Sequence, residues 1–205
     1  MFSTVCMPSS RNRPVAFGVA ALVVAGALYP VLVYYGRALV PPLAFVAVAL
    51  ALIGLRFAVC SSPAARVWRL PLAAAAVLVG VLAAFDGALA ARAYPVALSL
   101  GTAAVFGASL LHPPSLVERF ARLREPDLPP AGQAYCRTVT VVWAVWLVLN
   151  AAVAGTLALW GSDEAWALWT GLIAYAVMGV LFGGEMLIRR SVRRGTDEGR
   201  RQAGA

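Results

Sequence analysis

The sequence predicts an all-α fold: a polytopic transmembrane helical bundle of about six spans with both chain ends in the cytoplasm. Two observations predict it. Hydrophobic residues make up 61% of the chain and charged residues 13%, whereas soluble domains hold roughly 45–50% and 25%. All 17 basic residues are arginine, and they gather in alternate gaps between the apolar runs. We expect a single transmembrane domain over residues 1–205.

Each expected span is an apolar run of about 20 residues, the length at which a helix crosses a bilayer. The runs do not alternate apolar and polar residues, so barrel strands are not expected. The six runs are residues 15–34, 39–55, 70–90, 93–111, 138–160 and 166–188. The first resembles a cleavable signal peptide, because Arg11 and Arg13 precede it and small residues occupy 25–27. Its apolar stretch continues to Tyr34, longer than a signal core, so we expect it to be retained.

The arginines orient the chain, because positively charged loops remain in the cytoplasm. The face that receives few of them carries only Arg37 and Arg92, with the acidic Asp163 and Glu164. We therefore expect an inner-membrane protein with a cytoplasmic loop at 112–137 and a basic cytoplasmic tail at 189–205. The fifteen arginines on the cytoplasmic face are Arg11, Arg13, Arg56, Arg66, Arg69, Arg119, Arg122, Arg124, Arg137, Arg189, Arg190, Arg193, Arg194, Arg200 and Arg201.

Cysteine positions agree with this orientation. Cys6, Cys60 and Cys136 all fall in segments placed in the cytoplasm, where thiols stay reduced. With a single histidine and no close cysteine pair, we expect no metal site, cofactor or disulfide. The net charge of +8 lies beside membrane ends, so the expected partner is the anionic lipid surface and not nucleic acid.

The loop at 112–137 has the pattern of a short amphipathic helix. Ser115 and Glu118 have the spacing of a capping box, and Pro126 ends the helix. The apolar face is expected to hold Leu116, Val117, Phe120 and Leu123, with Glu118, Arg119 and Arg122 around the polar side. The helix is either a connector that packs two spans together or an element that docks a partner at the membrane interface.

Polar residues inside the spans are the other candidates for function. Asn150 shares a helical face with Trp143, and its amide is expected either to bridge helices or to contact a substrate. Asp86 is either a proton- or ion-coupling carboxylate or, with Arg92, the flank of a short outer loop. Glu185 has the spacing for a helical ion pair with Arg189.

Gly179 and Gly183 form a pair of small residues that admits a neighbouring helix. That helix belongs either to the same bundle or to a second protomer of a homo-oligomer. Catalytic motifs are missing: the sequence has no phosphate-binding glycine loop, no nucleophile elbow and no lysine. We expect no enzymatic activity.

The second half of the chain contains an ordered set of motifs, and each motif alone is weakly specific. They are Asp86, Arg92-Ala-Tyr-Pro95, Pro114-Ser-Leu-Val-Glu-Arg119, Leu128-Pro129, Trp143 and Asn150. In this order, over about residues 80–190, the chain resembles the intracellular septation protein A family of small bacterial inner-membrane proteins, as a divergent relative. The resemblance implies an accessory or scaffold protein in cell-envelope synthesis or septation that acts through other inner-membrane proteins.

A second hypothesis is a small transporter or lipid-handling protein, accessory to lipid or pigment biosynthesis. It requires Asp86, Asn150 and Glu185 to line one cavity.

Overall fold

Every regular element of the described chain is a helix, which confirms the all-α prediction. The computed structural model describes residues 13–59, 67–123 and 125–186. Beyond η3 the chain stays helical to Met186, so α7, η3 and the following residues form one C-terminal helix, Asp163–Met186. The elements are α1 (Arg13–Gly36), α2 (Pro42–Val59), α3 (Arg69–Phe85), α4 (Gly87–Leu111), α5 (Leu116–Arg122), α6 (Pro130–Trp160), α7 (Asp163–Leu168) and the π-helical turn η3 (Trp169–Ile173).

Three of these helices are long and apolar enough to cross a membrane: α4, α6 and the C-terminal helix. Shorter apolar helices accompany them, among them α2 and α3. These helices bear out the prediction of a transmembrane protein.

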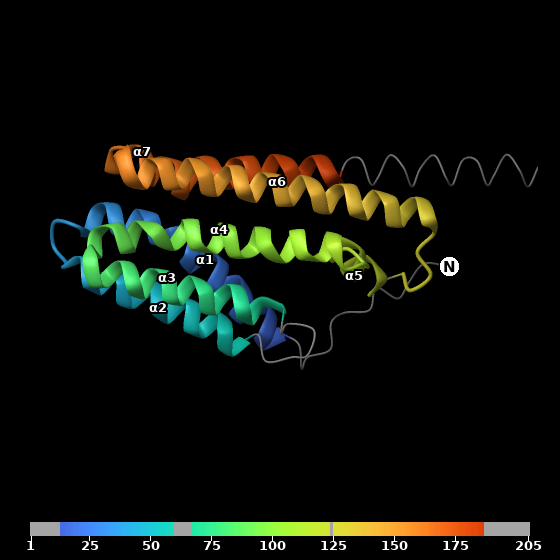
Figure 1. The fold of residues 1–205 in the computed structure, drawn as a ribbon, viewed down its shortest axis with the longest axis horizontal. Helices are drawn as coiled ribbons and strands as arrows, with labels where there is room; N and C mark the ends of the chain where they lie inside the picture. Colours follow the sequence, from blue (N-terminus) through green and yellow to red (C-terminus); the bar gives the residue numbers. More distant parts are fainter. Residues whose placement is uncertain (1–12, 60–66, 124, 187–205) are drawn as a thin grey trace, which may run out of the picture.

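The helices lie side by side along the long axis, and α4 is central (Figure 1). It packs against α3 and α2 on one side and α6 on the other. The C-terminal helix runs beside α6 (Figure 1) and contacts α1 through α7 and η3. α7 lies at one end of the molecule and α5 at the opposite end (Figure 1), and we call these the α7 end and the α5 end.

Small residues fill the centre of the bundle, and many large apolar side chains point outward. Leu70, Phe85 and Val180 are each at least 75% exposed. Such outward side chains are expected where lipid replaces water around a protein, while small interior residues allow helix backbones to approach closely. Buried alanines include Ala49, Ala75, Ala90, Ala91, Ala97 and Ala158.

Two predicted boundaries are wrong. The turn expected at 91–92 lies at Asp86, whose carboxylate accepts hydrogen bonds from the backbone N–H groups of Ala88 and Leu89 and so begins α4 there. α6 begins at Pro130, eight residues before the expected span, because a proline fits the first turn of a helix. The segment 112–129 joins α4 to α6, and it contains α5.

Candidate functional site

The segment around α5 differs from the sequence prediction at its start, where the capping box is absent. The Ser115 hydroxyl makes no capping hydrogen bond and is buried without a partner among the described residues. Neighbouring helices supply the cap instead: Ser109 Oγ accepts from Leu116 N at 2.9 Å, and Thr140 Oγ1 accepts from Val117 N at 3.4 Å. The N-terminus of α5 is therefore held by α4 and α6.

The two faces of α5 also differ from the prediction. Glu118 is buried, and its Oε1 accepts from Arg122 Nε at 2.9 Å and Nη2 at 2.8 Å. Of the expected apolar face, Leu116 is buried, but Phe120 is 58% and Leu123 80% exposed. α5 packs chiefly on α6, as a connector would, and it leaves two large apolar side chains uncovered by the described chain.

Two arginines hold carbonyl groups in the last turn of α4 and in the residues that follow it. Arg119 donates from Nε to Pro114 O at 2.8 Å and from Nη2 to His112 O at 3.0 Å. Arg137, on α6, donates from Nη1 to Leu110 O at 3.1 Å. Because the last carbonyls of a helix have no intrahelical donor, these guanidinium groups fix the path of the chain from α4 into α5.

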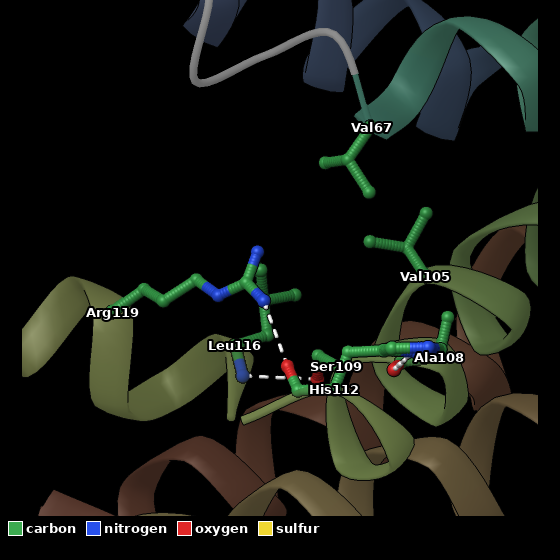
Figure 2. Close-up of a pocket in the computed structure, with 7 residues that line it drawn as sticks. All are labelled: Val67, Val105, Ala108, Ser109, His112, Leu116 and Arg119. Atoms are coloured by element: carbon green, nitrogen blue, oxygen red, sulfur yellow. Dashed lines mark hydrogen bonds between the residues drawn. The ribbon is translucent and has the colours of Figure 1, made fainter. Parts of the chain in front are cut away.

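A cavity of about 140 Å³ lies beside this turn. Figure 2 shows the Arg119 side chain extending from α5 toward it, with the guanidinium group between His112 and Val67. The His112 ring lies alongside α4, with Nδ1 3.2 Å from Ala108 O. The lining is apolar apart from Ser109, His112 and Arg119. Its residues are Val67, Val105, Ala108, Ser109, His112, Leu116 and Arg119.

Asn150 lies in the middle of the bundle and connects three helices. Its Nδ2 donates to Ser99 Oγ on α4 at 2.9 Å, and its Oδ1 accepts from Trp169 Nε1 in η3 at 3.1 Å. Because an indole N–H can only donate, the second bond fixes the orientation of the amide. Both ends of this amide thus bind other helices of the same chain. Trp143, expected on the same face, is half-buried.

A second polar contact forms where Pro95 interrupts the hydrogen bonds of α4. Proline has no N–H, so the carbonyl of Ala91 lacks its intrahelical donor. The Tyr29 hydroxyl donates to this oxygen at 2.9 Å and also lies 3.3 Å from Phe45 O on α2. With the Tyr29 side chain 1% exposed, the bond joins α1 to α4 in the interior.

Arg56 is placed differently from the prediction, which put it in a cytoplasmic gap. It lies in the last turn of α2, and its Nη1 donates to Tyr94 Oη at 2.8 Å inside the bundle. A Cβ on Gly26 would lie 2.5 Å from Arg56 Nη2, so the guanidinium group packs directly on α1. Pro30 lies four residues after Gly26 and has no N–H, so the backbone carbonyl of Gly26 lacks its intrahelical donor.

Ion pairs connect the α7 end. Asp163 pairs with Arg37 and, at 3.2 Å, with Arg92, while Glu164 lies 3.5 Å from Arg37. The Tyr34 hydroxyl is also 3.5 Å from Glu164. The four charges that the sequence assigns to one membrane face therefore meet in one cluster, which joins α1, α4 and α7.

The residues proposed to line a transport cavity do not converge. Asp86 is exposed at the α7 end. Asn150 binds Ser99, which lies roughly 20 Å from Asp86 along α4 at about 1.5 Å per residue. Glu185 is 22 residues beyond Asp163 in the C-terminal helix, roughly 33 Å away along its axis. The three carboxylate and amide groups are spread along the bundle.

Two other expectations concern the C-terminal helix. Arg189, the expected partner of Glu185, lies outside the described residues, as do Cys6 and Cys60. A Cβ on Gly179 or Gly183 would meet nothing within 4 Å. These glycines therefore do not face another helix within the described chain.

Comparison with protein families, curated proteins and solved structures finds no match to this chain. The interior contacts of Tyr29, Arg56 and Tyr94 were not predicted from the sequence. Neither were Ser99 and Trp169, the partners of Asn150. Pro30 and Pro95 were the available signal, because a proline within an apolar helix leaves a carbonyl that needs a donor from elsewhere.

Proposed function

We propose that this chain is a six-span protein of the bacterial inner membrane, with both ends and α5 in the cytoplasm. The distribution of arginine supports this orientation. So does the cluster of Arg37, Arg92, Asp163 and Glu164 at the α7 end. Charges that pair with one another at a single end of the bundle are compatible with short loops on the outer face.

Its function is that of an accessory or scaffold protein for other inner-membrane proteins. The observation that carries this proposal is that the interior polar groups bind other helices of the same chain. Asn150, Tyr29 and Arg56 each bind another helix of the same chain, and Asp86 and Glu185 lie far from Asn150. A bundle of this kind is suited to present surfaces and is poorly suited to move a polar solute.

The surface that we assign to a partner is the outward face of α5, with Phe120 and Leu123 exposed. It lies at the end of the bundle that we propose to be cytoplasmic, the side to which the sequence assigns fifteen of the 17 arginines. The ordered motifs by which the chain resembles the intracellular septation protein A family include this helix, and this resemblance favours a role in septation or envelope synthesis.

The test is complementation of a deletion strain, scored by cell length, septum frequency and lipid composition. We expect the deletion to alter morphology and the wild-type gene to restore it. A Phe120→Ser/Leu123→Ser variant should reach the membrane in normal amount and fail to restore it. The matched control is Val81→Ser, which changes a residue 53% exposed on α3 and should complement fully.

Full complementation by the α5 variant would contradict the assigned surface. A deletion strain with normal morphology and altered lipid composition would contradict the scaffold role and favour the lipid-handling alternative.

A further inference from the structure

The cavity at the α5 end has the composition of a site for an amphiphile. Its walls are apolar on the sides formed by the turn before α3 and by α4, with Val67, Val105 and Ala108. On the opposite side, the guanidinium group of Arg119 on α5 reaches back to His112, which follows the end of α4 (Figure 2). A group that enters would meet hydrocarbon on one side and a cation on the other.

Arg119 has hydrogen-bond donors left for a ligand. A guanidinium group carries five N–H donors, and Arg119 uses two of them, on Pro114 O and His112 O. Three remain without an acceptor among the described residues. Because the two backbone bonds hold the side chain in place, the remaining donors are pre-organised, as a bidentate contact to a phosphate requires.

The charge of the site favours an anion. No lining residue is acidic. The nearest carboxylate in sequence, Glu118, is buried and paired with Arg122. Arg119 therefore supplies the permanent charge of the lining.

The size and position of the site point to part of a lipid. A volume of about 140 Å³ is close to that of cavities of about 150 Å³ that hold a benzene ring, so it admits a head group and not a whole lipid. It lies at the end of α4, a helix long enough to cross the membrane. Next to it, the Leu111 side chain is 78% exposed. It offers apolar surface outside the cavity for the acyl chains of the lipid.

We propose that the cavity between α4, α5 and the turn before α3 binds the phosphate head group of a membrane phospholipid, with Arg119 as the phosphate ligand. This inference rests on the proposed membrane placement of the α5 end and is independent of any protein partner. Bound lipid would fix the turn from α4 to α5 and so the outward face of α5.

The experiment is native mass spectrometry of the purified full-length protein in detergent, titrated with dioleoyl phosphatidylglycerol. We expect one tightly retained lipid in the wild type. Arg119→Gln should weaken its binding roughly tenfold or more, as expected for the loss of a charged hydrogen-bond donor. Arg137→Gln is the matched control, because Arg137 likewise donates to a backbone carbonyl near this turn, Leu110 O, but does not line the cavity.

A second pair of variants tests the cavity without touching the arginine. Ala108→Leu places a larger side chain in the lining and should abolish the retained lipid. Ala104→Leu, one turn earlier at an exposed position outside the lining, should leave it in place. If thermal unfolding shows that Arg119→Gln is not folded, the comparison of Ala108→Leu with Ala104→Leu alone decides the result.

Two further ligands distinguish the source of the phosphate. Dioleoylglycerol, which lacks phosphate, should not be retained, and glycerol phosphate, which lacks acyl chains, should bind at least tenfold more weakly than the lipid. Equal retention of lipid by Ala108→Leu and Ala104→Leu would overturn the proposal, as would equal affinity for glycerol phosphate. Because binding is measured on purified protein, these results do not depend on the complementation experiment.

Discussion

The hydroxyl group of Tyr29 offers a sharp test of how the bundle accommodates its prolines. The group donates to the carbonyl of Ala91 at 2.9 Å, and this carbonyl has no intrahelical donor because Pro95 lacks an N–H. Tyr29→Phe removes the hydroxyl with little change in shape. It leaves a carbonyl without a donor in the interior, where Tyr29 is 1% exposed.

We expect Tyr29→Phe to lower the free energy of unfolding by about 1–2 kcal/mol. Leaving a buried acceptor unsatisfied costs about 1–3 kcal/mol, and hydrogen bonds between membrane helices are worth about 0.6–2 kcal/mol. In a Pro95→Ala background the new backbone N–H can reach Ala91 O, so the same substitution should cost less than about 0.5 kcal/mol.

The measurement is reversible unfolding of the full chain in mixed micelles with a rising fraction of sodium dodecyl sulfate, followed by far-ultraviolet circular dichroism. The two single variants and the double variant give the coupling free energy directly. Tyr35→Phe is the control, because Tyr35 is 73% exposed and its change should cost almost nothing. An equal cost of Tyr29→Phe with and without Pro95 would refute the reasoning.

Two further substitutions test other contacts by the same unfolding assay. Gly26→Ala should gain less stability than Gly80→Ala, because its Cβ would lie 2.5 Å from Arg56 Nη2 and displace this guanidinium group. A Cβ at Gly80 meets nothing within 4 Å and should stabilise the helix by about 0.5–1 kcal/mol. Equal gains from the two substitutions would count against the Arg56 packing. Asp163→Asn should destabilise the protein more than Glu164→Gln, because Asp163 pairs with two arginines. The difference should shrink in high salt, which screens the charges. Equal effects of the two substitutions would contradict the shared ion pair.

The membrane character of the chain and most helices could be predicted from composition and length alone. The expected apolar runs each correspond to a helix of the described chain, because about 20 consecutive apolar residues leave few other structures for the backbone. The sequence assigned Arg37, Arg92 and Asp163 to the same end of the bundle, and the structure brings these three charges together.

Boundaries and side-chain directions could not be predicted in the same way. Hydropathy does not distinguish the residues on either side of Asp86, so the turn was expected at 91–92, whereas the carboxylate caps α4 at residue 86. The capping box at Ser115 was plausible by spacing, yet Ser109 and Thr140 satisfy these N–H groups. These partners come from other helices and have no signature near Ser115.

Arg56 shows why the interior site was missed. An arginine at the end of an apolar run is normally a topological signal, and nothing next to it in the sequence indicates that it turns inward to Tyr94. The two prolines were informative, because each creates a carbonyl without an intrahelical donor. Which side chain donates to that carbonyl depends on how α1, α2 and α4 pack, and the sequence does not give this packing.

Both proposals rest on the proposed orientation of the bundle, and cysteine labelling tests that orientation most directly. In a chain whose own cysteines are replaced, a single cysteine is placed at Leu39, 86% exposed between α1 and α2, or at Leu123, 80% exposed beside α5. A membrane-impermeant maleimide should label position 39 in spheroplasts and position 123 only after lysis. Labelling of position 123 in intact spheroplasts, with position 39 protected until lysis, would contradict the account.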